Sequence, residues 1–270
     1  MDVRNKPIGI FDSGIGGLTV AREVMNMMPR EDIVYFGDTA RVPYGTKSKE
    51  TVTRFAFSGI RFLLSCDVKM IIVACNTVSA TCLDRLQEST PVPVIGVIDP
   101  GARAAALSTR NRIVGIIGTE RTIKSGAYID AIHRLSKEIK IYSKPCPLFV
   151  PLVEEGWLEN KAAFYTASTY LMPLKEEGID TLVLACTHYP LLKPTLSSVM
   201  GNDVKLVDSA YETAKQVKII SKGMDLACSP EHKASYQYFV SDNPEKFIQV
   251  GEKFLGRPIN PINVIDPELD

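Results

Sequence analysis

The chain has 270 residues, of which 45% are hydrophobic and 23% are charged, a composition typical of a globular protein that needs no disulfide or metal to hold its core. Lysine and arginine together number 31, as do aspartate and glutamate, so the formal net charge is zero. This balance gives no electrostatic sign of a nucleic-acid or anionic-membrane partner, and no apolar stretch is long enough to span a bilayer.

Short apolar runs alternate with longer amphipathic segments along the whole chain. The predicted strands lie at 8–11, 33–36, 70–74, 94–97, 113–117, 139–142, 181–185, 204–207 and 236–240. The predicted helices lie at 18–28, 49–64, 78–88, 100–107, 123–137, 162–177, 191–200, 210–222 and 244–254. Strands that alternate with helices in this way predict an α/β fold built on parallel sheets. The tail at 258–270 contains three prolines, so we expect it to be irregular or a short edge strand.

The two halves of the chain show a coarse internal similarity, because each begins with a strand, a polar turn and a helix. We therefore predict two similar α/β domains, each a mostly parallel sheet flanked by helices. Residues 1–98 together with 209–270 form the first domain, and residues 99–208 form the second. The pattern alone leaves open whether the chain after residue 209 returns to the first domain, and we assign it there.

The cysteines show no C-x-x-C pair and no dense framework, which predicts free thiols in a reducing cytosol. They are Cys66, Cys75, Cys82, Cys146, Cys186 and Cys228. Residues 1–6 run directly into the first predicted strand and lack the apolar region of a signal peptide. We therefore expect a cytoplasmic protein.

Two short segments, V-A-C-N-T at 73–77 and L-A-C-T-H at 184–188, are alike although they lie far apart. Each follows an apolar run typical of a buried parallel strand, so Cys75 and Cys186 fall at the carboxyl ends of strands, where ligands bind in α/β sheets. A single cysteine in such a place is more often a small buried hydrophobic residue. The pair instead predicts one sulfur on each side of a substrate, as a two-base proton transfer requires.

Polar residues follow both cysteines. Asn76, Thr77, Thr187 and His188 stand where the next helices begin, so their side chains and the helix amides can hold a carboxylate. Plain helix capping explains the same residues and is compatible with that role. His188 lies two residues after Cys186 and can serve it as a proton partner. No metal site is predicted, since the three histidines of the chain stand apart from any cluster of ligands.

The first strand leads into the glycine-rich turn I-G-I-F-D-S-G-I-G-G at 8–17. A dinucleotide fingerprint would need a third glycine where Thr19 stands, although Asp38 could pass for its ribose-binding acid. Asp12 would also place a carboxylate where a pyrophosphate needs amides. A purely structural interpretation is a tight turn in which Asp12 or Ser13 caps the helix. A functional interpretation places the Asp12 carboxylate beside the reacting centre as a proton acceptor or orienting group.

Two further segments carry weaker signals. Pro43, Tyr44 and Gly45 form a fixed turn in a loop, a place that often has a binding role. The apolar tract at 150–157 contains Glu154 and Glu155. A solvated helix start is the favoured interpretation for Glu155, whereas the role of Glu154 stays open.

Four of these segments together resemble the glutamate racemase family, within the aspartate/glutamate racemases. They are I-G-I-F-D-S-G-I-G-G-L-T, Y-F-G-D-T-A-R-V-P-Y-G, I-V-A-C-N-T and L-A-C-T-H-Y-P, in the order of the family and without a departure at a motif position. The resemblance covers nearly the whole chain. It implies two α/β domains that face each other across a buried cleft, and a bacterial enzyme that makes D-glutamate for peptidoglycan, and hence for cell-wall biogenesis and cell shape, without a cofactor.

The resemblance also implies roles for individual residues. Cys75 and Cys186 are the acid/base residues, with Asp12 assisting Cys75 and His188 assisting Cys186. The α-amino and α-carboxylate groups of the substrate would be bound by Ser13, Asn76, Thr77 and Thr187. The side-chain carboxylate would be held by Pro43, Tyr44 and Gly45. Three further residues would lie close to the site: Thr119, Thr122 and Glu154. The implied partner is the small molecule glutamate, with no metal, nucleic acid or membrane, and a homodimer is allowed.

The chemistry agrees with this resemblance. Racemisation removes a weakly acidic α-proton and returns it on the opposite face, and thiols with a pKa near 8.5 can do both near neutral pH. One alternative is a racemase for aspartate or a related acid, since one methylene changes binding by only about 1–3 kcal/mol. A second, from a different class, is a non-catalytic nucleotide- or metabolite-binding module.

Overall fold

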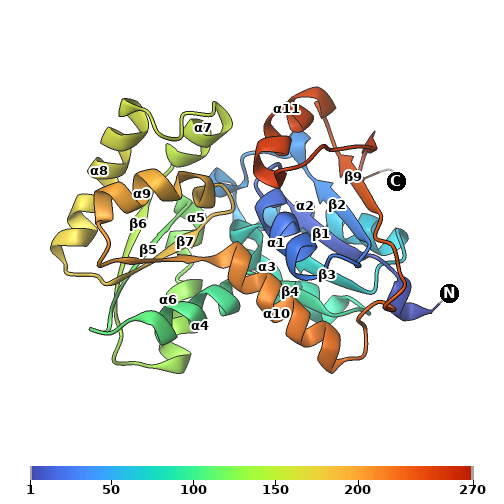
Figure 1. Ribbon diagram of the computed structural model, residues 1–270, viewed down its shortest axis with the longest axis horizontal. Coiled ribbons are helices and arrows are strands. Elements are labelled where there is room, and N and C mark those ends of the chain that lie inside the picture. The colour runs from blue at the N-terminus through green and yellow to red at the C-terminus, as the bar shows by residue number, and fades with distance from the viewer. Residues whose placement is uncertain (1, 269–270) are drawn as a thin grey trace.

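The computed structural model describes residues 2–268 and contains two parallel sheets that lie side by side (Figure 1). The first sheet has the order β10-β9-β2-β1-β3-β4 and the second has the order β6-β5-β7-β8. The strands of the first sheet are β1 Ile8–Asp12, β2 Ile33–Gly37, β3 Met70–Val73, β4 Val94–Gly96, β9 Tyr236–Val240 and β10 Ile262–Val264. Those of the second are β5 Ile113–Gly118, β6 Lys140–Pro145, β7 Thr181–Ala185 and β8 Lys205–Asp208. The predicted α/β class, with two domains of helix-flanked parallel sheets, is confirmed.

Helices cover both faces of the two sheets (Figure 1). They are α1 Leu18–Met27, α2 Lys49–Ser65, α3 Asn76–Ser89, α4 Ile98–Ser108, α5 Glu120–Lys124, α6 Ala127–Leu135, α7 Phe149–Glu154, α8 Lys161–Glu176, α9 Lys193–Met200, α10 Ser209–Gly223 and α11 Pro244–Leu255. Short 3-10 turns lie at Val3–Asn5, Thr39–Arg41, Tyr44–Thr46 and Tyr189–Leu192. Because helices shield both faces, β1, β3 and β7 are buried along their whole length, which is why their sequences are continuous apolar runs.

The chain passes between the two sheets twice. It leaves the first sheet after β4 and continues into α4, and it returns after β8 through α10, which packs against both α1 and α4. β9 then pairs in parallel with β2, and β10 pairs with β9, so the end of the chain extends the first sheet. The predicted domain boundaries fall close to the starts of α4 and α10, and as domain limits they stay a prediction.

Two predicted helices differ from the structure, and one helix was not predicted. The helix expected at 123–137 is two helices, because Gly126 adopts a left-handed φ of 73° between α5 and α6. The helix expected at 191–200 begins as a 3-10 turn and becomes α-helical only at Lys193. α7 lies in the tract at 150–157, and the helix start favoured for Glu155 is wrong, because Glu155 is the C-cap of α7. The prolines near the tail leave a short edge strand, β10, as expected.

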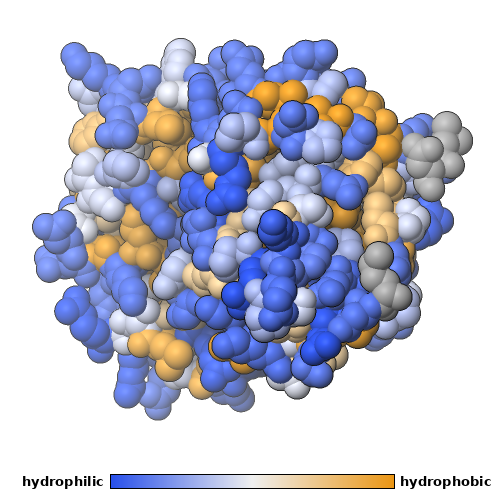
Figure 2. Space-filling view, turned by 45° about the vertical axis from the view of Figure 1, so that its right-hand side comes forward, coloured by the Kyte–Doolittle hydropathy of each residue, from blue (hydrophilic) through white to orange (hydrophobic). Residues whose placement is uncertain are grey.

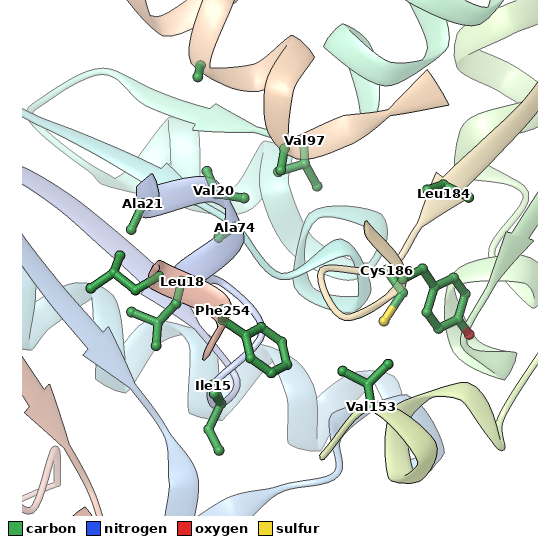
Figure 3. Close-up of a cluster of buried hydrophobic side chains, with 14 of the residues drawn as sticks. Ile15, Leu18, Val20, Ala21, Ala74, Val97, Val153, Leu184, Cys186 and Phe254 are labelled. Carbon is green, nitrogen blue, oxygen red and sulfur yellow. The ribbon is translucent and has the colours of Figure 1, made fainter. Parts of the chain in front are cut away.

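Buried residues from both domains form one continuous core cluster. Figure 3 shows part of it, with the Cys186 sulfur pointing away from Leu184 toward the side where Val153 and Phe254 lie. On the face shown in Figure 2, hydrophilic residues cover most of the surface and hydrophobic residues form separate patches. No helix among residues 2–268 combines the length and the apolar character needed to cross a membrane.

Candidate active site

A cavity of about 240 Å³ lies where the carboxyl ends of strands from both sheets meet. Its lining residues are Ser13, Gly14, Ile15, Thr39, Val42, Pro43, Tyr44, Gly45, Cys75, Asn76, Thr77, Thr119, Val150, Glu154, Cys186, Thr187, His188, Asp242, Asn243, Lys246 and Phe247. Pockets for drug-sized ligands measure about 300–1,000 Å³, so this cavity suits a small metabolite. The two predicted cysteines, which follow strands of different sheets, line the same space.

Cys75 stands at the start of α3 and is 5% exposed. Its Sγ donates a hydrogen bond to Ser13 Oγ at 3.4 Å. Burial, and after it the charge of Asp12, raises the pKa of Cys75 to about 12. In the free protein this residue is therefore a neutral thiol at neutral pH, able to deliver a proton.

Asp12 lies behind the cavity wall and not in the lining. Its Oδ2 accepts the backbone N–H of Gly14 at 2.9 Å, whereas its Oδ1 has no hydrogen-bond partner among the described residues. Burial raises the pKa of Asp12, and the charge of His188 opposes that rise. The interpretation of Asp12 or Ser13 as a helix cap is wrong, because α1 has Gly17 as its N-cap and receives no side-chain cap hydrogen bond. Asp12 instead holds the turn and interacts electrostatically with Cys75.

The second cysteine has a different environment. Cys186 Sγ lies 4.0 Å from His188 Nδ1, and His188 Nε2 lies 3.2 Å from Glu154 Oε1. Glu154 Oε2 lies 3.6 Å from Lys246 Nζ, which comes from α11 of the other domain. A chain of four polar side chains thus runs from the Cys186 sulfur across the cavity wall.

The protonation of His188 follows from this chain. Burial lowers the pKa of His188, but its interactions with Cys186 and Glu154 outweigh that effect and raise the pKa to about 10. The hydrogen bond from His188 in turn lowers the pKa of Glu154, against its partial burial. At neutral pH the imidazolium form of His188 therefore lies beside Cys186, with the Glu154 carboxylate on its far side.

Gly16 is a point of close approach between the two domains at the site. A Cβ at Gly16 would lie 2.5 Å from His188 Nδ1 and closer still to the Thr187 hydroxyl. The Thr187 carbonyl also accepts a hydrogen bond from Thr19 Oγ1 at 3.0 Å. Gly16, the second glycine of the glycine-rich turn, therefore serves a domain contact.

Hydrogen-bond donors and hydroxyls line the rest of the cavity. Asn76 Nδ2 is buried and has no partner among residues 2–268. Thr77 Oγ1 lies 3.1 Å from Thr119 Oγ1, which is 3.0 Å from Thr122 Oγ1. Thr122 is buried just behind the lining, and Thr119 caps α5. These groups can hold a carboxylate and an amine without a cation of their own.

The Pro43-Tyr44-Gly45 loop also lies at the cavity. The Tyr44 hydroxyl is committed to Asp38, whose carboxylate also accepts from Arg41 Nε at 2.6 Å and Ser241 Oγ at 2.8 Å. Both Asp38 oxygens are therefore occupied, and the structure does not leave this acid available as a ribose ligand.

Part of the lining was missed by sequence reasoning. These residues are Gly14, Ile15, Thr39, Val42, Val150, Asp242, Asn243, Lys246 and Phe247. Four of them follow β9, a predicted strand whose carboxyl end reaches the site because it pairs with β2. A search of every strand end for polar residues would have found Asp242 and Asn243.

Known proteins resemble this chain over most of its length. The family model described as Asp/Glu/Hydantoin racemase matches residues 18–217. A glutamate racemase from Geobacter metallireducens is 53% identical over 265 residues, covering 98% of both chains. The crystal structure of a glutamate racemase from Bacillus anthracis superposes with a TM-score of 0.94 at 39% identity, covering 97% of this chain and 98% of that one. A glutamate racemase from Francisella tularensis, crystallised with D-glutamate, gives 0.92 at 40% identity, covering 99% and 100%.

We predict that Gly16→Ala forces Thr187 and His188 away from the first domain. Overpacking of this kind costs about 1–3 kcal/mol, measurable as a lower free energy of unfolding in urea, and the His188 ring resonances should shift. Gly223→Ala is the matched control, because a Cβ there meets nothing within 4 Å. A Gly16→Ala protein with wild-type stability and wild-type His188 resonances would contradict the close approach.

We also predict that Glu154→Gln lowers the pKa of His188, because a carboxylate that stabilises the imidazolium is lost. In the native protein His188 should stay protonated until the pH approaches about 10. NMR titration of the ring protons measures this directly, since the chain has only three histidines. Glu155→Gln removes a neighbouring exposed acid as a control, and an unchanged midpoint in Glu154→Gln would refute the assignment.

Proposed function

The chain belongs to the Asp/Glu/hydantoin racemase family and is an amino-acid racemase, and on this premise we propose that it interconverts L- and D-glutamate by proton transfer between Cys75 and Cys186. One observation carries the proposal: the two sulfurs follow β3 and β7 of different sheets and line one cavity. A substrate held between two sheet edges can present opposite faces of its α-carbon to the two thiols.

The proton balance needs one thiolate and one thiol. The thiolate removes the α-proton and becomes a thiol, and the opposite thiol delivers its own proton to the other face and becomes a thiolate. The substrate leaves with inverted configuration, and the enzyme carries the same total charge with the roles of its sulfurs exchanged. Proton exchange with solvent or a reaction in reverse restores the first state.

The surroundings of the two sulfurs favour an unequal resting state. Cys75, with its raised pKa, is the thiol. The protonated His188 lies beside Cys186 and stabilises negative charge on that sulfur. This arrangement supports Cys186 as the base toward L-glutamate, as the family resemblance implies. The reverse direction uses Cys75 as the base, with Asp12 as its partner.

The charge that develops on the α-carbon and its carboxylate needs stabilisation, and no cofactor is proposed to supply it. The unpartnered Asn76 Nδ2, the amides at the start of α3 and the Thr187 side chain lie in the cavity wall and suit that task. Donors fixed before the reaction are effective because they need no reorganisation when charge appears.

Glutamate is favoured over aspartate because the relatives described above are glutamate racemases. The Pro43-Tyr44-Gly45 loop is proposed to receive the side-chain carboxylate, and it packs so closely that a Cβ on Gly45 would lie 2.9 Å from Thr119 Cβ. The alternative of a nucleotide-binding module loses its main support, since both Asp38 oxygens are occupied.

We further propose a cytoplasmic enzyme that supplies D-glutamate for peptidoglycan, and thereby serves cell-wall biogenesis and cell shape. The bacterial source of the three relatives supports this role. All six cysteines are free thiols, as suits a reducing compartment. Homodimer formation stays a prediction, as does the absence of nucleic-acid and membrane partners.

The direct test follows racemisation of D-glutamate by circular dichroism with protein freed of metals and pyridoxal phosphate. Cys75→Ala and Cys186→Ala should each lower kcat by at least about 10²–10⁴-fold, the usual contribution of a general acid or base. Both should keep the native far-ultraviolet spectrum, because the change of volume is small. Cys82→Ala alters a buried cysteine outside the cavity and should retain activity.

A native protein that binds D-glutamate without racemising it would instead support a binding module. Faster turnover of D-aspartate than of D-glutamate would favour the aspartate alternative. Substantial turnover by either cysteine variant would remove the two-thiol mechanism.

A further inference from the structure

Tyr128 connects the second domain to a lining residue of the first. It lies on α6, is 2% exposed, and its hydroxyl donates to Asn76 Oδ1 at 2.7 Å. Asn76 begins α3 directly after Cys75. Tyr128 is absent from the cavity lining, and its contact with a lining residue is the hydrogen bond to Asn76.

The same phenol also lies where the chain crosses between the domains. Its oxygen is 3.5 Å from the carbonyl of Val97, which precedes α4, and it interacts with Ser209, which begins α10. Gly101 leaves room for the ring, because a Cβ there would lie 3.3 Å from the phenol oxygen. Tyr128 therefore contacts both crossing segments as well as Asn76.

The hydrogen bond from the Tyr128 hydroxyl sets the orientation of the Asn76 carboxamide. With Oδ1 engaged by the phenol, Nδ2 remains without a partner among residues 2–268 although it is buried. Buried donors in folded proteins are normally paired, and an orphaned one is costly. A substrate carboxylate oxygen is the acceptor that would satisfy it, whereas a flipped amide would present an oxygen and repel the carboxylate.

We propose that Tyr128 is a positioning residue that holds the Asn76 amide with its N–H donor directed to the substrate carboxylate. Because Tyr128 belongs to the second domain, carboxylate binding then depends on how the two domains are arranged. The inference rests on the proposed racemase function. Both enantiomers share the α-carboxylate, so loss of the phenol hydroxyl affects L- and D-glutamate alike.

Tyr128→Phe removes only the hydroxyl and is the first test. We expect kcat/KM to fall about tenfold in both directions, the scale for disturbing one hydrogen bond to a charged group. Tyr238→Phe is the matched control, since Tyr238 is a buried tyrosine on β9 outside the cavity whose hydroxyl has no hydrogen-bond partner in the described chain. It should leave kcat/KM unchanged.

A double-mutant cycle separates positioning from general support of the fold. If Tyr128 acts through Asn76, Tyr128→Phe has no further effect on kcat/KM in an Asn76→Ala background. The same tenfold loss in both backgrounds would overturn the inference, as would unchanged kcat/KM in Tyr128→Phe alone.

A second variant keeps the test independent of the folding of Tyr128→Phe. Asn76→Asp retains an oxygen for the phenol but replaces the free donor with a charged acceptor, so kcat/KM should fall at least as far as in Asn76→Ala. Wild-type activity in Asn76→Asp would reject the donor assignment. If the wild-type protein does not racemise glutamate, the proposed function itself is refuted. Failure of the proposed function is thereby distinguished from failure of the role proposed for Tyr128.

Discussion

The close contact between the two domains at Gly16 is the constraint on which the site depends. Because Gly16 has no side chain, Thr187 and His188 of the second domain can lie against the turn that follows β1 of the first. This contact brings the carboxyl ends of two separate sheets to one cavity. Without it, each Ala-Cys segment would end its own sheet, and the two sulfurs would not line one cavity.

The two sulfurs share a position in the fold but differ in electrostatics. Burial, and after it the charge of Asp12, raises the pKa of Cys75, whereas Cys186 lies beside a histidine whose pKa is raised by Cys186 itself and by Glu154. The two cysteines therefore follow strands in the same way, but their electrostatic environments differ. The raised pKa of Cys75 and the charged imidazole beside Cys186 suit the unequal roles proposed for the two thiols.

Local pattern was enough to predict the parts of the site that each strand end carries by itself. The apolar runs before Cys75 and Cys186 indicated buried parallel strands, and the structure has them as β3 and β7. Features that depend on contacts between segments far apart in the sequence could not be predicted. Lys246 reaches the cavity because β9 pairs with β2, and Tyr128 reaches Asn76 because the second domain packs across the first. Neither residue stands in a motif that its neighbours in sequence would identify.

Isotope transfer during a single turnover tests the central claim most directly. L-glutamate with protium at its α-carbon is incubated with the protein in D2O, and the enantiomers are separated at low conversion and analysed by mass. With one thiol on each face, the newly formed D-glutamate carries deuterium from its first appearance, because the delivering thiol has already exchanged with solvent, and the remaining L-glutamate stays largely protiated. Substantial protium at the α-carbon of new D-glutamate would mean that a single base serves both faces, and it would contradict the account built on Cys75 and Cys186.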